Sequence, residues 1–146
     1  MPVIDNWWQT ETGWPIAANL RGLEPMPIKA GSPSVAVPGY DVRVLDESAQ
    51  PVPAGTEGAI AIRLPLPPGT LPTLWQDDER YVAGYLSVYD GYYLTGDGGM
   101  IDEDGYVYVL GPNGRAPLPT KDLEVWRVSS PIVGPLADPK FDWYTN

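Results

Sequence analysis

Hydrophobic and polar positions alternate along three stretches of the chain, a pattern typical of half-buried β-strands. The first stretch covers residues 41–46 (DVRVLD), and the second covers residues 58–64 (GAIAIRL), where isoleucines and a leucine share one face. These two strands are expected to pair as neighbours. The third stretch covers residues 106–111 (YVYVLG) and follows a DEDG turn and the segment YYLTGDGGMI at 92–101. Residues 92–111 therefore predict a β-hairpin.

A single segment has the spacing of a helix. Behind two aspartates, residues 78–88 place Tyr81 and Tyr85 at helical spacing. Aspartate accepts hydrogen bonds from free backbone N–H groups and favours a helix N-terminus. Gly84 lies in the middle of the segment, where glycine lowers helix propensity. The sequence therefore predicts one short helix over 78–88.

Prolines interrupt the rest of the chain. Residues 14–40 contain five prolines, so we expect loops and sheet edges there, with one short strand at 34–37 (SVAV). Residues 65–72 are too rich in proline for a helix or a strand. Residues 112–146 contain six prolines without a sustained period and predict an irregular or poorly ordered tail. The expected fold class is mainly β with one short helix (α+β), formed by residues 1–111.

The composition limits the chemistry of the chain. Its 146 residues include no cysteine and no histidine, which excludes disulfides, thiolate chemistry and histidine-based catalysis within this chain. A net charge of −10, from 19 acidic and 9 basic residues, argues against a nucleic-acid partner. No apolar run approaches the ~20 residues of a membrane span. We therefore expect no membrane association and a cytoplasmic location.

Two short motifs carry candidate chemistry. Residues 5–13 (DNWWQTETG) combine two tryptophans with hydroxyls that can donate to anionic oxygens, and Glu11 can hold a hard cation such as Mg²⁺. Residues 93–99 (YLTGDGG) place Asp97 between glycines after a strand, where a carboxylate can accept the two hydroxyls of a ribose. Each motif alone is better explained structurally, the first as a turn with core tryptophans and a capping threonine, the second as an acid in a tight turn.

Taken together and in order, WWQTETG, VPGYDVRVLDESAQPVPAGTEGAIAIR, YLTGD and DEDGYVYVLG resemble the AMP-forming short-chain acyl-CoA synthetases. These are the propionyl- and acetyl-CoA synthetases among the adenylate-forming enzymes, and LPLPPGTLPTLWQDDERYV is closer to the propionyl type. The resemblance runs over roughly residues 3–111. It implies the β-rich part of the family's large AMP-binding domain. It also implies the reaction of a short-chain carboxylate, ATP and CoA to acyl-CoA, AMP and pyrophosphate.

The same resemblance implies roles for individual residues. The implied nucleotide-binding residues are Asp5, Asn6, Trp7, Gln9, Thr10 and Asp97. The first three would lie along the adenine, Thr10 would meet the α-phosphate, and Asp97 would bind the ribose hydroxyls. Glu11 would hold the Mg²⁺ that accompanies ATP. Trp8 would close the acyl pocket and limit it to short chains.

The chain departs from the family pattern on both sides of the resemblance. The family's phosphate loop lies well upstream of WWQTETG, whereas six residues precede Trp7 here. After Gly111 the family continues with an arginine, a hinge aspartate and a mobile domain that carries a catalytic lysine. Residues 112–114 (PNG) and the surroundings of Lys121 do not match that pattern. We therefore expect a fragment without ligase activity of its own, which exposes apolar surface and strand edges that favour self-association.

A non-catalytic role is the alternative. A β-rich acidic domain with many tryptophans and tyrosines can stack exposed aromatic rings on carbohydrate or on a partner protein. The six tryptophans are spread along the chain, so the sequence does not decide whether they line one surface. A truncated gene product without a selected function is the third possibility.

Overall fold

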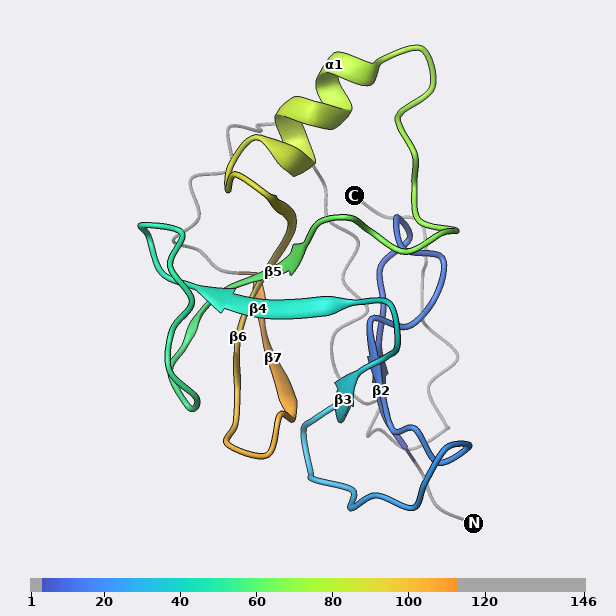
Figure 1. Ribbon diagram of the computed structural model, residues 1–146, viewed down its shortest axis with the longest axis vertical. Coiled ribbons are helices and arrows are strands. Elements are labelled where there is room, and N and C mark those ends of the chain that lie inside the picture. The colour runs from blue at the N-terminus through green and yellow to red at the C-terminus, as the bar shows by residue number, and fades with distance from the viewer. Residues whose placement is uncertain (1–3, 113–146) are drawn as a thin grey trace, which may run out of the picture.

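Two antiparallel β-sheets make up most of the computed structural model, which describes residues 4–112 (Figure 1). The smaller sheet has the order β1–β2–β3 and consists of β1 (Asn6–Trp7), β2 (Ala17–Ala18) and β3 (Val35–Ala36). The larger sheet has the order β4–β5–β6–β7 and consists of β4 (Asp41–Leu45), β5 (Gly58–Arg63), β6 (Tyr92–Ile101) and β7 (Val107–Pro112). The expected mainly β fold with one short helix is confirmed. The tail predicted for 112–146 lies outside the described residues, apart from Pro112 at the end of β7.

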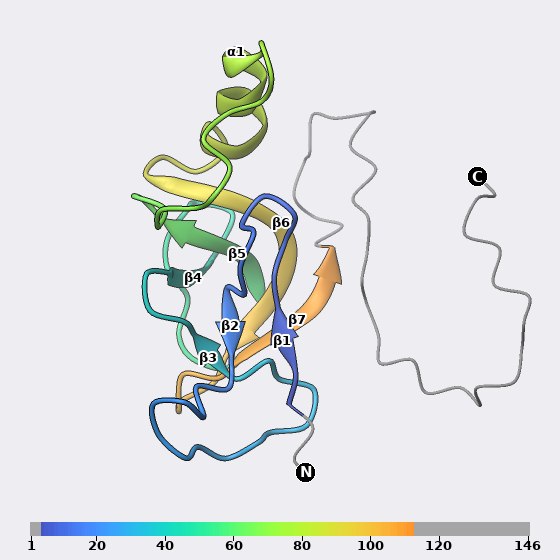
Figure 2. The same ribbon diagram turned by 90° about the vertical axis from the view of Figure 1, so that its right-hand side faces the viewer.

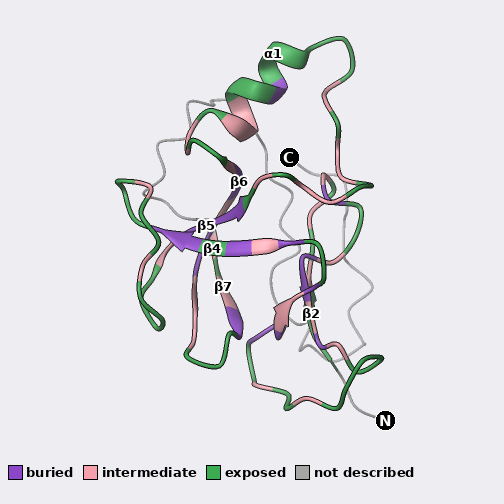
Figure 3. Cartoon of the chain, in the orientation of Figure 1, coloured by how far each residue is buried: buried purple, intermediate pink, exposed green. Residues whose placement is uncertain are grey.

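The larger sheet contains the strands that alternation predicts. β4 pairs with β5 as expected, and Val42 and Val44 are buried while Arg43 between them is exposed. β5 lies inside the sheet and is covered on both faces, because Ala59 and Ile60 are both buried. β6 and β7 form the predicted hairpin. Figure 3 shows the resulting run of buried residues along β4 and β5.

Two glycines permit close packing within this sheet. A Cβ atom on Gly99 would collide with the carbonyl oxygen of Tyr108 and would lie 2.6 Å from Cδ1 of Ile60. A Cβ atom on Gly58 would collide with the carbonyl oxygen of Leu45. The pairing of β6 with β7 also shifts register between Gly98 and Gly99. Gly99 therefore stands where the sheet has no room for a side chain.

Two strands of the smaller sheet, β2 and β3, come from residues 14–40, which were expected to be mostly loop, and β1 lies in the motif DNWWQTETG. The strand predicted at 34–37 is present as β3, but β1 and β2 were not predicted. Strands of two residues are too short to show alternation. They are fixed instead by contacts such as the hydrogen bond from the backbone N of Ile16 to the carbonyl of Trp7, at 2.7 Å.

One hydrophobic core joins the two sheets; the smaller sheet lies beside the larger one in Figure 1 and in front of it in the turned view of Figure 2. Its buried members come from strands of both sheets and from residues next to those strands: Ile16, Ala17, Val37, Tyr40, Val42, Ile60, Ile62, Tyr93 and Val107. Polar bonds reinforce the junction. The backbone N of Val107 donates to the carbonyl of Ser34 at 2.8 Å, and the Ser32 hydroxyl donates to the carbonyl of Val107 at 2.6 Å.

The helix predicted over 78–88 is shorter than expected and changes type. α1 (Asp78–Tyr81) is a single turn, and the side chain of Asp77 caps it by accepting from the backbone N of Arg80 at 3.2 Å. The chain then continues as a π-helical turn, η1 (Val82–Leu86). Valine and glycine in this turn contribute little α-helical propensity, and single π-turns are wider than the α-helix that precedes them. Among the described residues, no helix is both long and apolar enough to traverse a bilayer.

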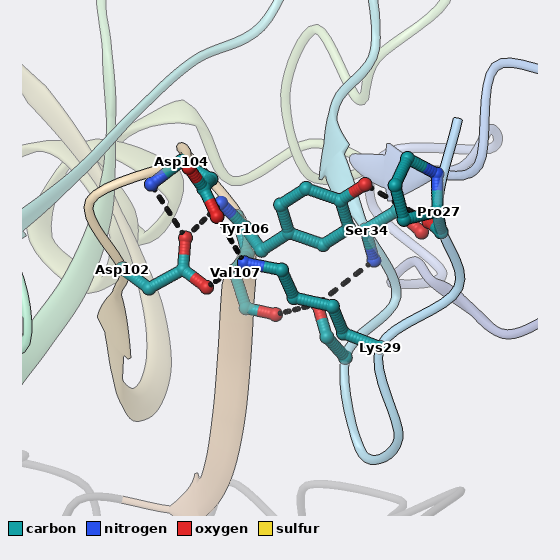
Figure 4. Close-up of polar contacts among 8 residues, drawn as sticks. Pro27, Lys29, Ser34, Asp102, Asp104, Tyr106 and Val107 are labelled. Atoms are coloured by element: carbon teal, nitrogen blue, oxygen red, sulfur yellow. Dashed lines mark hydrogen bonds and ion pairs between the residues drawn. The ribbon is translucent and has the colours of Figure 1, made fainter. Parts of the chain in front are cut away.

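Lys29 ties the loop between β2 and β3 to the β6–β7 hairpin (Figure 4). Its Nζ lies 2.6 Å from Oδ2 of Asp102 and 2.7 Å from Oδ2 of Asp104. The same Nζ lies 4.2 Å from the ring centroid of Tyr106, a cation–π contact. The Tyr106 hydroxyl donates to the carbonyl of Pro27 at 2.9 Å. These contacts join two segments that are distant in the sequence.

Replacing Lys29 with methionine is expected to lower the free energy of unfolding near neutral pH and to lose this effect in acid. Burial opposes ionisation of Asp102, but the hydrogen bond from Lys29 and those from the backbone N atoms of Tyr106 and Asp104 together outweigh it and lower the pKa of that carboxyl below 3.8. The hydrogen bonds to Asp102 and then Asp104 raise the pKa of Lys29 above 10.5. The ion pair therefore stabilises the folded protein fully between about pH 3.8 and about pH 10.5, the ordinary pKa values of the two groups. It is lost as pH falls through the folded pKa of Asp102, or rises through that of Lys29.

Urea unfolding of both proteins at about pH 7 and about pH 2 measures this difference. The matched control is Arg63→Met, since Arg63 is an exposed cation that forms no ion pair within residues 4–112. A Lys29→Met effect of equal size at both pH values would contradict the ion-pair explanation.

Candidate functional site

The motif DNWWQTETG forms β1 and the turn that follows it. Thr12 is buried, and its hydroxyl accepts from the backbone N of Gln9 at 3.0 Å and donates to the carbonyl of Gln9 at 2.8 Å. The backbone N of Leu71, in the proline-rich segment 65–72, donates to the carbonyl of Glu11 at 2.7 Å. Gly13 has a positive φ of 60°, and a Cβ atom there would lie 3.4 Å from the carbonyl oxygen of Gly69. The proline-rich segment thus packs directly on this turn.

Gln9 connects the turn to the end of β6. Its Nε2 donates to the carbonyl of Thr95 at 2.6 Å and to Oδ2 of Asp97 at 3.1 Å. Its Oε1 accepts from the Tyr93 hydroxyl at 3.2 Å. The Thr95 hydroxyl donates to the carbonyl of Ile60 at 2.6 Å and accepts from the backbone N of Asp97 at 3.2 Å. The two candidate motifs, which are 88 residues apart at Gln9 and Asp97, therefore lie in direct contact.

Two stacked tyrosines connect Gln9 to Glu11. The rings of Tyr85 and Tyr93 are 5.5 Å apart between centroids and 8° from parallel. The Tyr85 hydroxyl donates to Oε1 of Glu11 at 2.9 Å. Burial, followed by the hydrogen bond to Glu11, raises the pKa of Tyr85 to about 12, and burial also raises the pKa of Tyr93. Both phenols therefore remain protonated donors at neutral pH.

The other predicted residues lie on the same N-terminal segment with different exposure. Asp5 and Asn6 are exposed, and Asp5 accepts from the backbone N of Asn6 at 2.8 Å. Trp7 is half-buried and packs against the core. Trp8 is 52% exposed, and Thr10 is exposed in the turn. The structure thus joins Gln9, Glu11 and Asp97 in one network and leaves these five residues beside it.

A separate hollow of about 370 Å³ lies between β4 and the loop around Val52. Its lining includes Tyr40, Arg43 and Ile101, and none of the predicted site residues contributes to it. The hollow is therefore distinct from the candidate site.

Within residues 4–112, no three aspartate, glutamate, histidine or cysteine side chains come together to enclose a metal ion. Mg²⁺ needs no such cage, because it is commonly held by one or two carboxylates together with water and substrate phosphates. Glu11 suits that role. Its Oε1 accepts from Tyr85, while its Oε2 accepts no hydrogen bond from the described residues. Glu11 therefore fits as a carboxylate ligand for a Mg²⁺ ion that arrives bound to a nucleotide.

The sequence motifs did not identify Tyr85 and Tyr93 as members of the site. Tyr85 was assigned only to the face of a helix, and Tyr93 only to a strand. Their hydroxyls reach residues 74 and 84 positions away, respectively. Tyr93 stands two residues before the TGD motif, which was an indication for that residue, whereas the sequence held none for Tyr85.

Comparison with known proteins shows which family the chain is related to. No model of a known protein family matches the chain. Curated short-chain acyl-CoA synthetases match it at 45–46% identity over about three quarters of its length. The matched part of this chain is therefore homologous to a segment of the AMP-forming short-chain acyl-CoA synthetases.

Three individual relatives show how much of the chain and of each relative is matched. The chain is 46% identical over 113 residues to propionate–CoA ligase of Escherichia coli K12, covering 76% of this chain and 18% of that protein. It is 46% identical over 114 residues to the human mitochondrial acyl-CoA synthetase short-chain family member 3, covering 75% and 16%. An uncharacterized protein of Pseudomonas aeruginosa PAO1 is 56% identical over 110 residues, covering 75% and 18%. The chain thus spans less than a fifth of these relatives.

Proposed function

We propose that residues 4–112 form one wall of the adenylating site of a short-chain acyl-CoA synthetase. The complete reaction would join a short-chain carboxylate to CoA, with ATP converted to AMP and pyrophosphate. The observation that carries this proposal is the contact of Gln9 with Asp97, which unites the two candidate motifs in one surface. Propionate is the favoured acid, because a propionate–CoA ligase is among the relatives.

The residues of this wall would bind and orient the nucleotide. Asp97, held by Gln9, would accept hydrogen bonds from the ribose hydroxyls, as carboxylates after strands do in other nucleotide sites. Thr10, exposed in the turn, would donate to the α-phosphate. Asp5, Asn6 and Trp7 would lie along the adenine.

Two further residues would act on the metal and the acid. Glu11 would hold the Mg²⁺ that arrives with ATP, and that ion would neutralise charge on the phosphate oxygens. The exposed ring of Trp8 would close the acyl pocket and restrict it to short chains. Positioning and charge neutralisation need neither histidine nor cysteine, in keeping with their absence from the chain.

Replacing Asp97 with asparagine is expected to weaken AMP binding by the 146-residue chain. The affinity should fall about tenfold, because a hydrogen bond to an ionised acceptor contributes about 1.5–3 kcal/mol. Isothermal titration calorimetry with AMP measures the change.

The matched control is Asp90→Asn, since Asp90 is an exposed aspartate in the turn before β6. It should leave the affinity unchanged. Equal affinity in all three proteins, or no AMP binding by the unaltered chain, would contradict the proposal.

An aromatic binding module is the second candidate. It is favoured by the exposure of Trp8, Trp14 and Trp75, which is 52%, 68% and 87% respectively. Tryptophan fluorescence during titration with a soluble oligosaccharide, compared with Mg²⁺–ATP, separates the two functions. A response to the sugar and none to the nucleotide would favour the module.

A further inference from the structure

We propose that Tyr85 is a positioning residue that orients the Glu11 carboxylate for the Mg²⁺ of a bound nucleotide. The inference rests on the proposed function and adds a residue to it. The Tyr85 hydroxyl engages Oε1 of Glu11 at 2.9 Å and leaves Oε2 available to the ion. A carboxylate ordered before binding loses less conformational freedom when the metal arrives.

Glu11 is held at its backbone as well as at its side chain. Its carbonyl accepts from the backbone N of Leu71 at 2.7 Å, which fixes the turn against the proline-rich segment. With the backbone fixed, the side-chain torsions are the remaining freedom of this residue. The hydrogen bond from Tyr85 is the contact among residues 4–112 that restricts them.

Tyr85 is in turn held by two neighbouring rings. It stacks on Tyr93 at 5.5 Å, and its centroid is 5.4 Å from that of Tyr81. Tyr93 is only 1% exposed, so the stack is anchored in the core. The π-turn η1 carries Tyr85 into this stack, and isolated π-turns are frequent at functional sites. Tyr85 is therefore ordered independently of any ligand.

The same stack reaches the other end of the candidate site. The Tyr93 hydroxyl donates to Gln9, and Gln9 donates to Asp97. Hence one pair of aromatic rings contacts both the residue expected to hold the metal and the residue that orients the ribose-binding carboxylate. The bond from Tyr85 to Glu11 shares no atom with the bonds of Gln9, so removing the Tyr85 hydroxyl deletes the first without deleting the others.

Two tyrosine-to-phenylalanine variants isolate the hydroxyl of Tyr85. Tyr85→Phe keeps the ring stack and removes the donor to Glu11. Tyr81→Phe is the matched control, because Tyr81 is a buried neighbour whose hydroxyl forms no hydrogen bond within residues 4–112. Both changes remove one oxygen from adjoining rings.

Calorimetry of the full 146-residue chain with ATP, in Mg²⁺ or in EDTA, tests the proposal. Mg²⁺ should raise the affinity of the unaltered chain for ATP. Tyr85→Phe should reduce that enhancement about tenfold while changing the affinity in EDTA by less than about twofold. Tyr81→Phe should change neither. In a Glu11→Gln background, where the enhancement is absent, Tyr85→Phe should have no further effect.

Each other outcome has a definite meaning. A full Mg²⁺ enhancement in Tyr85→Phe would overturn the positioning role and leave the proposed function standing. A parallel loss of affinity in Mg²⁺ and in EDTA would also overturn it, since that result indicates general structural damage. Absence of any enhancement in the unaltered chain would overturn both the positioning role and the metal-binding part of the proposed function.

Discussion

Replacing Gly99 with alanine should lower the free energy of unfolding by about 3 kcal/mol. The added methyl group would collide with the carbonyl oxygen of Tyr108 and lie 2.6 Å from Cδ1 of Ile60. The carbonyl belongs to the strand paired with β6, so it cannot retreat without breaking the ladder. Ile60 is fully buried and has no space into which to move. Urea unfolding followed by circular dichroism measures the loss.

Gly84→Ala provides the control for this change. A Cβ atom on Gly84 meets no other atom within 4 Å, and its φ is not in the left-handed region. Alanine there should leave stability unchanged or raise it by about 0.5 kcal/mol, because the unfolded chain loses freedom. A Gly99→Ala protein as stable as Gly84→Ala would show that the strands separate easily at this point.

Replacing Gln9 with leucine should cost about 2–4 kcal/mol of the free energy of unfolding. The leucine matches the size of glutamine but can neither donate to Thr95 and Asp97 nor accept from Tyr93. The Tyr93 hydroxyl would then be buried without its acceptor, and an unsatisfied buried donor is more costly than a lost surface bond. Chemical denaturation gives the size of the effect. Backbone amide NMR should show the shifts concentrated in the turn 9–13.

The control is Gln50→Leu, at an exposed position whose side chain donates one long hydrogen bond, at 3.4 Å, to the carbonyl of Ser48. This change should stay within about 0.5 kcal/mol. If the two glutamine variants lose the same stability, the bridge between the motifs contributes little.

The sequence predicts the larger sheet well because its strands are long enough to show their period. Residues 41–46 and 58–64 alternate, and a DEDG turn separates the two strands of the hairpin. The smaller sheet was missed because its strands have two residues each. The helix was predicted in the right place. The spacing of its tyrosines does not show whether the α-helix continues after its first turn or changes into a π-turn.

The sequence predicts some residues of the candidate site but not the contacts that join them. Short motifs mark Glu11 and Asp97, because carboxylates beside glycines and hydroxyls suggest nucleotide chemistry. The bridge through Gln9 and the stack of Tyr85 on Tyr93 depend on side chains that meet only after the two sheets have packed. A glutamine and two tyrosines have many structural uses, so their types alone do not reveal these contacts.

The bond between Leu71 and Glu11 has a consequence for how such chains can vary. Both partners are main-chain atoms, so most side chains in the proline-rich segment could be exchanged without loosening the turn. An added or deleted residue there would instead shift the donor away from its acceptor and displace Gly69 from Gly13. Homologous chains should therefore accept amino-acid substitutions in this segment but keep its number of residues constant.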